Sequence, residues 1–487
     1  MANNLEIEKS ADPSCASSCH RAMQSHWHLI RDIFGGDPVI KRQRTKYLPK
    51  YEAESDTAYN YRLQSAPWRG EFVDADRSLS AKPFSKPVSL QGDVPDAIKE
   101  FSEDVTGQGR NLHEFARDLF TTAVGYGLGL ILIDYPKMQP GLTLADEKAT
   151  GARPYFIKYA PENILAAYFE QIAGRSVLTH LRLREFETVR DGYSEREICK
   201  IRIFERGFFE VWSDESGTFE LIESGSFNPI DIPAVFYFTG ERFGEYGVRP
   251  PLLDLAYMQI ELYQALSRWN EVLTYAGSPM LKVLGVDANQ LDTEQGKDGK
   301  RESVGPVGPK RIWVIPRGQD GQQGDVAYVQ PDAANLTEIR NQVAKVQEDF
   351  RRLALQPLLP QSGNITATSA AIEGAKSHSA VQAWAMGLKD ALEAALVFAA
   401  RWMSVPETAE IYIDTDFVVD FRPDTDVQQL IQLRTTGDLS QETLWDELTR
   451  RGTLGPQFDP QAEMLRIESE GQLNSDGNAG AELGAAA

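Results

Sequence analysis

The clearest hydrophobic pattern in this chain is an apolar stripe in its second half. Between residues 333 and 355, apolar positions recur three and four residues apart, the spacing of a helix face that packs on another helix. We call this face the helix seam, and its members are Leu336, Ile339, Val343, Val346, Phe350 and Leu353. Because such a face needs a neighbouring helix to cover it, the pattern indicates an assembly role more than a catalytic pocket.

Two further long helices are predicted on either side of the seam helix. One spans 252–275 and is preceded by two prolines, which favour a helix start. The other spans 366–402 and is rich in alanine, so that neighbouring elements can approach it closely. The insert at 279–331 is rich in glycine, glutamine and aspartate. Strand-like runs are predicted in this insert at 280–286, 311–315 and 326–329.

The first half of the chain mixes helical and alternating patterns. Helices are predicted at 56–80, 94–106 and 111–125, and Asn111 is the expected N-cap of the third. A buried strand follows at 130–134. Alternation over 154–238 predicts an antiparallel sheet with one solvated face.

These patterns predict an α+β domain over 26–250 and flexible residues before it. Residues 1–25 contain Asn, Ser, Ala and Asp without an apolar period, so we expect them to be flexible. At the other end, a short strand is predicted at 411–421 and a helix pair at 424–451. The tail from 471 is rich in Gly, Ala and Asn and is predicted to be disordered.

Composition and charge narrow the possible functions. The chain has 487 residues, three cysteines and a net charge of −21. Residues 404–487 contain 17 acidic residues and 5 arginines, a local charge of −12. Because tight DNA binding depends on Lys and Arg displacing counterions, a sequence-reading DNA clamp is not expected, whereas a surface past which DNA slides is compatible. Few cysteines, no apolar run of membrane length and no secretory signal predict synthesis in a reducing cytoplasm.

The candidate chemistry is sparse. The glycines of Gly125-Tyr126-Gly127-Leu128-Gly129 follow a predicted helix and precede a strand, the reverse of a phosphate-binding loop, so a close-packed turn is favoured. Cys15, Cys19 and His20 do not have a standard zinc spacing. Residues 41–50 are basic, and we interpret them as a solvated surface segment, with a patch for an acidic partner subunit as the alternative.

An acidic run also lacks the features of a metal site. Asp414, Asp416, Asp420, Asp424 and Asp426 are without the glycine turn and bidentate glutamate of a calcium loop. A solvated acidic strand edge is therefore the preferred interpretation. No catalytic residue, cofactor site or metal site is assigned.

Several short motifs, in their order along the chain, resemble the portal proteins of tailed bacteriophages. They also resemble the portal-like branch recorded in phage genomes under a domain of unknown function. The motifs are Tyr47-Leu48-Pro49 with Tyr61-Arg62, Ala116-Arg117-Asp118-Leu119-Phe120 leading to Tyr126-Gly127, Thr366-Ala367-Thr368-Ser369-Ala370, Phe417, and Gly437-Asp438-Leu439-Ser440-Gln441-Glu442-Thr443-Leu444. Each motif is weak alone, and the resemblance covers about residues 40–470.

The resemblance implies a portal-like α+β architecture with named regions. These are a flexible N-terminus at 1–25, a wing at 26–251, a stem helix at 252–278, a clip at 279–332, a second stem helix at 333–356, a tunnel loop at 357–365, a long helix at 366–403, a crown at 404–470 and a disordered tail at 471–487. The tunnel loop would comprise Pro357, Leu358, Leu359, Pro360, Gln361, Ser362, Gly363, Asn364 and Ile365.

The resemblance also implies partners. Portal proteins form a ring, usually of 12 subunits, at one capsid vertex of the virion, and are assembled in the host cytoplasm. The expected partners are further copies of this chain, the terminase large subunit, a head-completion or adaptor protein, capsid and scaffold proteins, and double-stranded DNA without sequence specificity. Lys310, Arg311, Trp313 and Arg317 are candidate docking residues of the clip, and Lys376, Lys389 and Arg401 are candidate DNA-facing cations, or else ordinary solvated or ion-paired side chains.

Two alternatives remain open from the sequence. A head-to-tail adaptor would also form a ring, although adaptors are usually much shorter than this chain. A dimeric enzyme would use 252–402 for dimerisation and would place a polar pocket around 125–134 in the 26–250 domain. The portal interpretation is preferred, then the adaptor, then the enzyme.

Overall fold

A computed structural model describes most of the chain. The described residues are 12–136, 152–227, 230–277, 280–284, 293–295, 301–303, 325–329, 333–354, 367–415, 423–450, 454, 458, 460 and 462–466. Contacts divide the chain into two units, Met1–Phe417 and Val418–Ala487, and each is described by itself. The fold is mixed α/β with antiparallel sheets, as the alternation in the sequence predicts.

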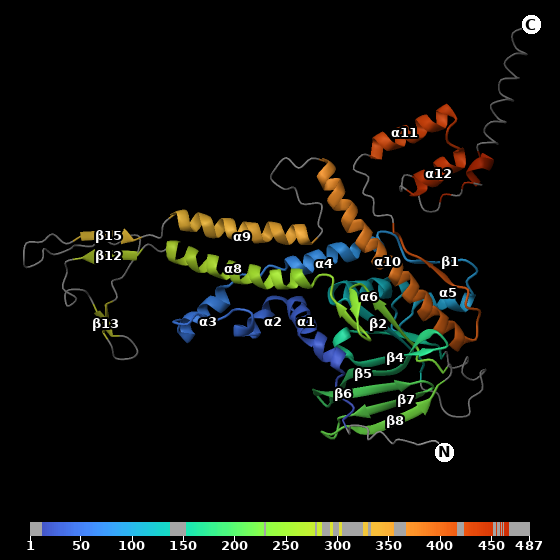
Figure 1. The fold of residues 1–487 in the computed structure, drawn as a ribbon, viewed down its shortest axis with the longest axis horizontal. Helices are drawn as coiled ribbons and strands as arrows, with labels where there is room; N and C mark the ends of the chain where they lie inside the picture. Colours follow the sequence, from blue (N-terminus) through green and yellow to red (C-terminus); the bar gives the residue numbers. More distant parts are fainter. Residues whose placement is uncertain are drawn as a thin grey trace, which may run out of the picture. The chain divides into compact units, whose positions relative to one another are not determined.

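Helices dominate the start of the first unit. They are α1 (Ser18–Phe34), α2 (Gly36–Arg42), α3 (Asp56–Ser65), α4 (Glu71–Ala81), α5 (Asp96–Glu103) and α6 (Leu112–Tyr126), with short 3-10 turns η1 (Arg44–Lys46) and η2 (Lys82–Phe84) (Figure 1). The predicted cap of α6 is confirmed, since Asn111 Oδ1 accepts a hydrogen bond from the Glu114 amide at 2.9 Å. Ser17 and Ser55 cap α1 and α3 in the same way.

The expectation of flexibility over residues 1–25 is wrong for the part that the structure describes. Helix α1 already begins at Ser18, and its side chains Met23 and Trp27 are completely buried. Together with Ile30 and Ile33 they form an apolar face at spacings of four and three. The sequence interpretation missed this face because the intervening Ser, His, Gln and Arg residues dominate the composition of the segment.

Two antiparallel sheets follow the helices. A three-stranded sheet has the order β3 (Tyr155–Tyr159), β2 (Leu128–Asp134), β9 (Ala234–Phe238). A five-stranded meander has the order β4 (Ile164–Ile172), β5 (Arg175–Asp191), β6 (Ser194–Glu205), β7 (Phe208–Ser213), β8 (Glu220–Ser226), and η3 (Pro161–Asn163) leads into it. A small hairpin pairs β10 (Glu241–Phe243) with β11 (Gly247–Arg249). The predicted antiparallel pairing over 154–238 is confirmed.

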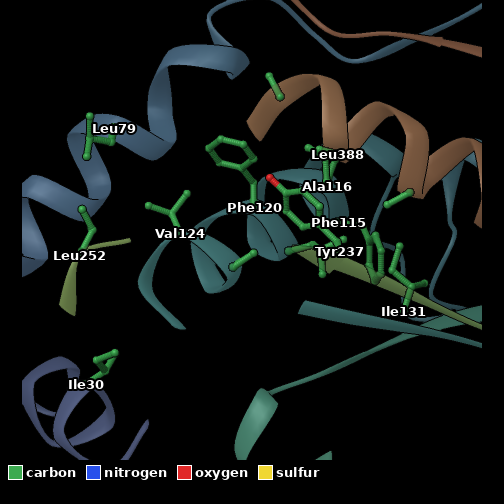
Figure 2. Close-up of a cluster of buried hydrophobic side chains, with 14 of the residues drawn as sticks. Ile30, Leu79, Phe115, Ala116, Phe120, Val124, Ile131, Tyr237, Leu252 and Leu388 are labelled. Carbon is green, nitrogen blue, oxygen red and sulfur yellow. The ribbon is translucent and has the colours of Figure 1, made fainter. Parts of the chain in front are cut away.

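The central strand β2 separates two hydrophobic cores. Its side chains Ile131 and Ile133 belong to a core built with α6, whereas Leu130 and Leu132 belong to a core with the meander. Figure 2 shows Phe120 and Tyr237 of the first core close together, with Leu388 beside them. Every residue of β2 except Asp134 is buried, because both faces of the strand are covered.

Three long helices and a β insert follow the sheets in the first unit. The helices are α8 (Leu253–Gly277), α9 (Ala333–Leu353) and α10 (Ala367–Met403). Between α8 and α9, β12 (Met280–Leu284) pairs antiparallel with β15 (Asp325–Val329), and β13 (Thr293–Gln295) pairs with β14 (Arg301–Ser303). The strand predicted at 311–315 lies outside the described residues.

The strand after α10 corrects the predicted boundary at residue 404. Strand β16 (Glu410–Tyr412) pairs antiparallel with β1 (Ser89–Gln91), and Ile411 and Ile413 are buried in the first core. Residues 404–415 are therefore part of the first unit. Sequence alone could not locate this partner strand, because it lies more than 300 positions earlier in the chain.

The prediction of a solvated acidic strand edge is wrong for Asp414, which lies in the same segment and is buried. Its side chain is only 3% exposed, and its Oδ2 accepts a hydrogen bond from the Ser85 hydroxyl at 3.1 Å. The Lys86 ammonium lies 3.5 Å from the same oxygen. The side chains of the other four aspartates in the run lie outside the described residues.

The second unit contains the predicted helix pair. It comprises α11 (Pro423–Thr436) and α12 (Gln441–Arg450). Gly437, at the expected turn, has φ +85°, a left-handed conformation that closes a helix and favours glycine. The Ser440 hydroxyl accepts a hydrogen bond from the Thr443 amide at 3.1 Å and so caps α12.

Candidate assembly surface

Helices α8 and α9 form an antiparallel hairpin. Strand β12 follows α8, strand β15 precedes α9, and the two strands pair with each other. Figure 1 shows the two helices side by side. Leu262 and Leu266 of α8 form a buried cluster with Val343 of α9, and Trp269 and Val346 pack against it. The helix seam is therefore covered, as its spacing requires, by a helix of the same chain. At 1.5 Å per residue, α8 and α9 are about 37 and 31 Å long.

The seam is not covered evenly along its length. Val343 is 8% exposed and Phe350 is 2% exposed, and Phe350 belongs to the first core rather than to the small α8–α9 cluster. Leu336 and Ile339 are half-buried. Leu353, the last seam residue, is 49% exposed. The end of the seam near Phe350 is thus anchored in the body, while among the described elements α8 is the one that packs along the rest of α9.

Side-chain amides fix α8 to the N-terminal helices. Gln259 is completely buried, and its Oε1 accepts a hydrogen bond from the Phe72 amide at 3.0 Å. Gln264 donates to the Tyr47 carbonyl at 2.9 Å, and Asn270 donates to the Ser65 carbonyl at 3.1 Å. These bonds to backbone oxygens hold the first five turns of α8 against α3, α4 and the segment before α3.

The structure brings together the motif residues Tyr47-Leu48-Pro49 and Arg62. Arg62 donates to both carboxylate oxygens of Glu54, at 2.8 and 2.7 Å, and to the Pro49 carbonyl at 2.8 Å. The Arg62 and Glu54 side chains are 5% and 6% exposed. This hydrogen bond to Arg62 holds the pKa of Glu54 below its usual value. The motif residue Arg62 therefore forms a buried ion pair with Glu54.

The basic segment 41–50 is largely neutralised within the chain. Lys41 lies 3.0 Å from Asp37, and Lys50 lies 2.6 Å from Asp56. Lys46 lies 2.9 Å from Asp32, whose carboxylate also accepts the Tyr47 hydroxyl at 2.7 Å. These pairs favour the interpretation of an ordinary surface segment over a patch for an acidic partner.

Much of the small-residue face of α10 is used inside the chain. Ala391, Ala395 and Ala399 are buried in the first core. At Gly387, an added Cβ would lie 3.5 Å from the Tyr237 ring, and the Tyr237 hydroxyl donates to the Trp384 carbonyl at 2.9 Å. Helix α10 therefore packs closely on β9. Among its described side chains, Met386 is a large apolar residue that stays 57% exposed.

The structure describes two of the three candidate DNA-facing cations, and both are ion-paired. Arg401 donates to both oxygens of Glu407, at 2.8 and 3.3 Å. The Lys389 ammonium lies 3.7 Å from Glu393. Each keeps roughly two fifths of its side chain exposed, 41% for Arg401 and 43% for Lys389. The side chain of Lys376 lies outside the described residues.

The predicted loop and docking residues cannot be placed on this surface. The whole tunnel loop, 357–365, lies outside the described residues. The same holds for the candidate clip residues Lys310, Arg311, Trp313 and Arg317. Both assignments stay predictions.

The glycine-rich segment at the end of α6 is a close-packed turn. Gly127 has φ +85°, and a Cβ there would lie 2.9 Å from the Pro250 Cα. A Cβ at Gly129 would lie 2.7 Å from the Leu119 side chain. The glycines allow the backbones to approach closely, and the chain then enters the buried strand β2. The described residues of this turn therefore form no polar pocket of the kind that the enzyme alternative expects.

Asp134, at the end of β2, belongs to a satisfied charge network. Its Oδ2 accepts hydrogen bonds from Arg202 at 2.9 Å and from the Tyr155 hydroxyl at 3.1 Å. Arg202 also lies 3.4 Å from Glu185, to which the Tyr159 hydroxyl donates. Burial raises the pKa of Tyr155 to about 12, so that this hydroxyl stays a donor. The network joins the two sheets.

The sequence interpretation missed this network. Arg202 alternates with Ile201 and Ile203 in β6, a pattern that normally places the polar residue in solvent. In the structure the Arg202 side chain is only 14% exposed, because the three-stranded sheet supplies Asp134 on that side. Sequence alone does not show that a second sheet covers the polar face.

The cysteine and histidine residues near the start do not gather into a metal site. His20 is 4% exposed, and its Nδ1 lies 2.9 Å from the Ile164 carbonyl. Burial lowers the pKa of His20 and raises the pKa of Cys19. Within the described part of the chain, no three metal-binding side chains cluster together. None of the described helices has the length and apolar character of a membrane span.

A comparison with protein families isolates the same helices as one sequence unit. Residues 251–403 match a family described as a domain of unknown function, DUF4055. The match covers under a third of the chain. Its bounds lie within two residues of the start of α8 and at the end of α10, so the match spans the hairpin, the insert and α10.

Comparisons with solved structures find chains from gene transfer agent (GTA) particles. A chain in the virion of the native GTA particle has a TM-score of 0.40 and 12% identity, covering 82% of this chain and 96% of that one. A chain in the neck of the native particle, computed with C12 symmetry, has a TM-score of 0.40 and 13% identity, with coverages of 78% and 90%. A chain in the neck of the empty particle, computed with C6 symmetry, has a TM-score of 0.41 and 13% identity, with coverages of 80% and 92%. A search of curated proteins finds no match to this chain.

Proposed function

We propose that this chain is a subunit of a phage portal, a ring-shaped channel at one capsid vertex. DNA would enter the capsid through this channel, driven by the terminase, and leave through it on ejection. The tail or an adaptor would attach below the ring. The protein would act as a structural component of the virion and carry out no catalysis. It would bind copies of itself, twelve in total by analogy with the family that the sequence resembles, and assemble in the host cytoplasm.

The order of elements is the observation that carries this proposal. An α+β body with β2 at its centre is followed by the α8–α9 hairpin, whose far end bears paired strands, and then by the long helix α10. In this proposal α8 and α9 are the stem, residues 279–332 are the clip and 357–365 are the tunnel loop. Of the motif residues, Tyr47 accepts a hydrogen bond from Gln264 of α8 through its carbonyl, and Arg62 donates to the neighbouring Pro49 carbonyl.

Exposed apolar side chains on the same helices support assembly. Tyr257 and Leu273 on α8 are 52% and 44% exposed, and Met386 on α10 is 57% exposed. Leu353 on α9 is 49% exposed. A heterologous contact that closes on itself produces a ring and would cover such residues. The strongly negative charge of the chain would keep DNA mobile in the channel by repulsion.

Mass photometry of the purified full chain and two variants tests the proposal. The wild type should form a single large species whose mass is a multiple of the 54.3 kDa chain. The double variant Leu273→Glu/Met386→Glu should remain folded but shift to small species, because charged side chains would enter the subunit contact. Ile222→Glu, at an exposed position of β8, is the matched control and should assemble normally. A wild-type chain that stays monomeric or dimeric, also in the presence of a capsid scaffold, would refute the proposal.

A further inference from the structure

Helices α4 and α6 border an open cavity of about 690 Å³ that is lined by three arginines. Arg77 comes from α4, Arg117 comes from α6, and Arg110 lies just before α6. Ser80 and Thr121 also line the cavity. We call this cavity the arginine groove. Three arginines in one groove are unexpected on a chain with a net charge of −21.

Two of these arginines have no counter-charge bonded to them. Arg77 and Arg117 are exposed, and neither side chain makes a hydrogen bond or ion pair with any residue that the structure describes. This differs from Arg401 and Lys389, which are both paired within the chain. The groove therefore presents guanidinium groups that are available to a ligand.

The acidic residues of the groove do not cancel this charge. Asp118 is held by Lys158, at 2.7 Å, and lies 3.5 Å from Arg110. Glu114 also lines the groove and removes one unit of charge. Among the residues that line the groove, three arginines face two carboxylates, which leaves an excess of one positive charge.

Ser80 supplies a separate observation. Its residue is 3% exposed, and its hydroxyl oxygen has no hydrogen-bond partner among the described residues. Buried hydroxyls in folded proteins are normally hydrogen-bonded. Ser80 lines the arginine groove, and its hydroxyl has no acceptor among the described residues. This hydroxyl can therefore donate a hydrogen bond to a bound oxyanion.

We propose that the arginine groove binds a phosphate group of a nucleic-acid backbone. Planar guanidinium groups match the oxygens of a phosphate in a bidentate manner, and a phosphate offers more acceptor oxygens than a carboxylate to Arg77, Arg117 and Ser80. The groove would bind any nucleic-acid sequence, because contacts to backbone phosphates carry no sequence information. This site lies on α4 and α6, so it does not depend on the proposed ring or on the hairpin.

Fluorescence anisotropy with the full chain and a labelled DNA duplex tests the site. The wild type should bind the duplex weakly, with an affinity that falls between about 50 and 200 mM salt. The variant Arg77→Ala/Arg117→Ala should bind about tenfold more weakly, and the slope of log affinity against log salt should fall by about 1.8, the value for two lost phosphate contacts. Ser80→Ala should weaken binding without changing this slope, because the hydroxyl is neutral.

The control variant removes the same charge elsewhere. Arg21 and Arg42 are exposed arginines of α1 and α2, outside the groove, and their side chains make no bond with a described residue. Arg21→Ala/Arg42→Ala should therefore change the affinity less than about twofold. An equal loss in both double variants would show that only the overall charge matters and would overturn the proposal. Thermal melts establish that all variants are folded.

Competition identifies the ligand chemistry. Inorganic phosphate should displace the duplex more effectively than chloride at equal ionic strength. Displacement by polyglutamate as effective as that by phosphate would assign the groove to an acidic peptide, and the proposal would fail. A wild type that does not bind the duplex at all would also overturn it. Mass photometry of the same samples measures assembly independently of DNA binding. A failure of the groove proposal can therefore be distinguished from a failure to form a ring.

Discussion

The two ends of the α8–α9 hairpin differ in what covers them. Near the body, Leu255 and Phe350 belong to the first core, and the Gln259 side chain of α8 accepts a hydrogen bond from the backbone of α4. Farther along, Val343 has only a small cluster with Leu262 and Leu266, and Leu273 is 44% exposed. Contacts within a single chain are therefore enough to hold the near end of the hairpin in place. The far end leaves apolar surface that copies of the chain are proposed to cover.

The largest effect is expected at the near end. Phe350→Ala removes a ring that is 2% exposed and leaves a cavity in the first core. Such substitutions cost about 3–5 kcal/mol of unfolding free energy. Chemical denaturation of the variant and wild type measures the loss. A change below about 1 kcal/mol would mean that this end of the hairpin is not anchored as described.

A buried carboxyl group beneath the near end should make stability depend on pH. Asp76 of α4 is completely buried, both of its oxygens lack hydrogen-bond partners among the described residues, and burial raises its pKa to about 7. Because the pKa is higher in the folded state than in the unfolded chain, stability is greatest at low pH and is lost as the pH rises through 7. The loss between pH 4 and pH 8 amounts to about 4 kcal/mol.

The isosteric variant Asp76→Asn isolates this contribution from other titrating groups. Its unfolding free energy should be close to that of the wild type at pH 4 and higher at pH 8. Denaturation curves at several pH values give the difference directly. A constant difference between the two proteins across this range would contradict the raised pKa.

The smallest of these effects is expected at the far end. Val343→Ala removes two methyl groups from the cluster with Leu262 and Leu266. At roughly 0.8 kcal/mol per buried carbon, we expect the isolated chain to lose about 1.5 kcal/mol. Denaturation under conditions that keep the chain monomeric measures this. A loss as large as that of Phe350→Ala would remove the distinction between the two ends.

The sequence predicted the long helices well, because their signals are local. The heptad spacing of the seam located α9, prolines and glycine bounded α8, and Asn111 and Gly437 marked a helix cap and a turn that the structure contains. The antiparallel sheets followed from alternation in the same way. Each of these features depends on residues that are close together in the sequence.

Features that depend on distant partners were not predictable. Strand β16 pairs with β1, Arg202 meets Asp134 across two sheets, and Asp414 is buried beside Ser85. The arginine groove also arises only when α4 and α6 pack, although Arg117 lies in a motif that the sequence interpretation noted. Helix α1 was missed for a different reason, since its apolar face is narrow and its other residues are polar.

Electron microscopy of the purified full chain tests the central claim most directly. The account predicts rings in end-on views, with a countable number of subunits and a central channel about 20 Å or more wide, enough for a DNA duplex. Class averages that contain only compact particles of one or two chains, at high protein concentration, would contradict it.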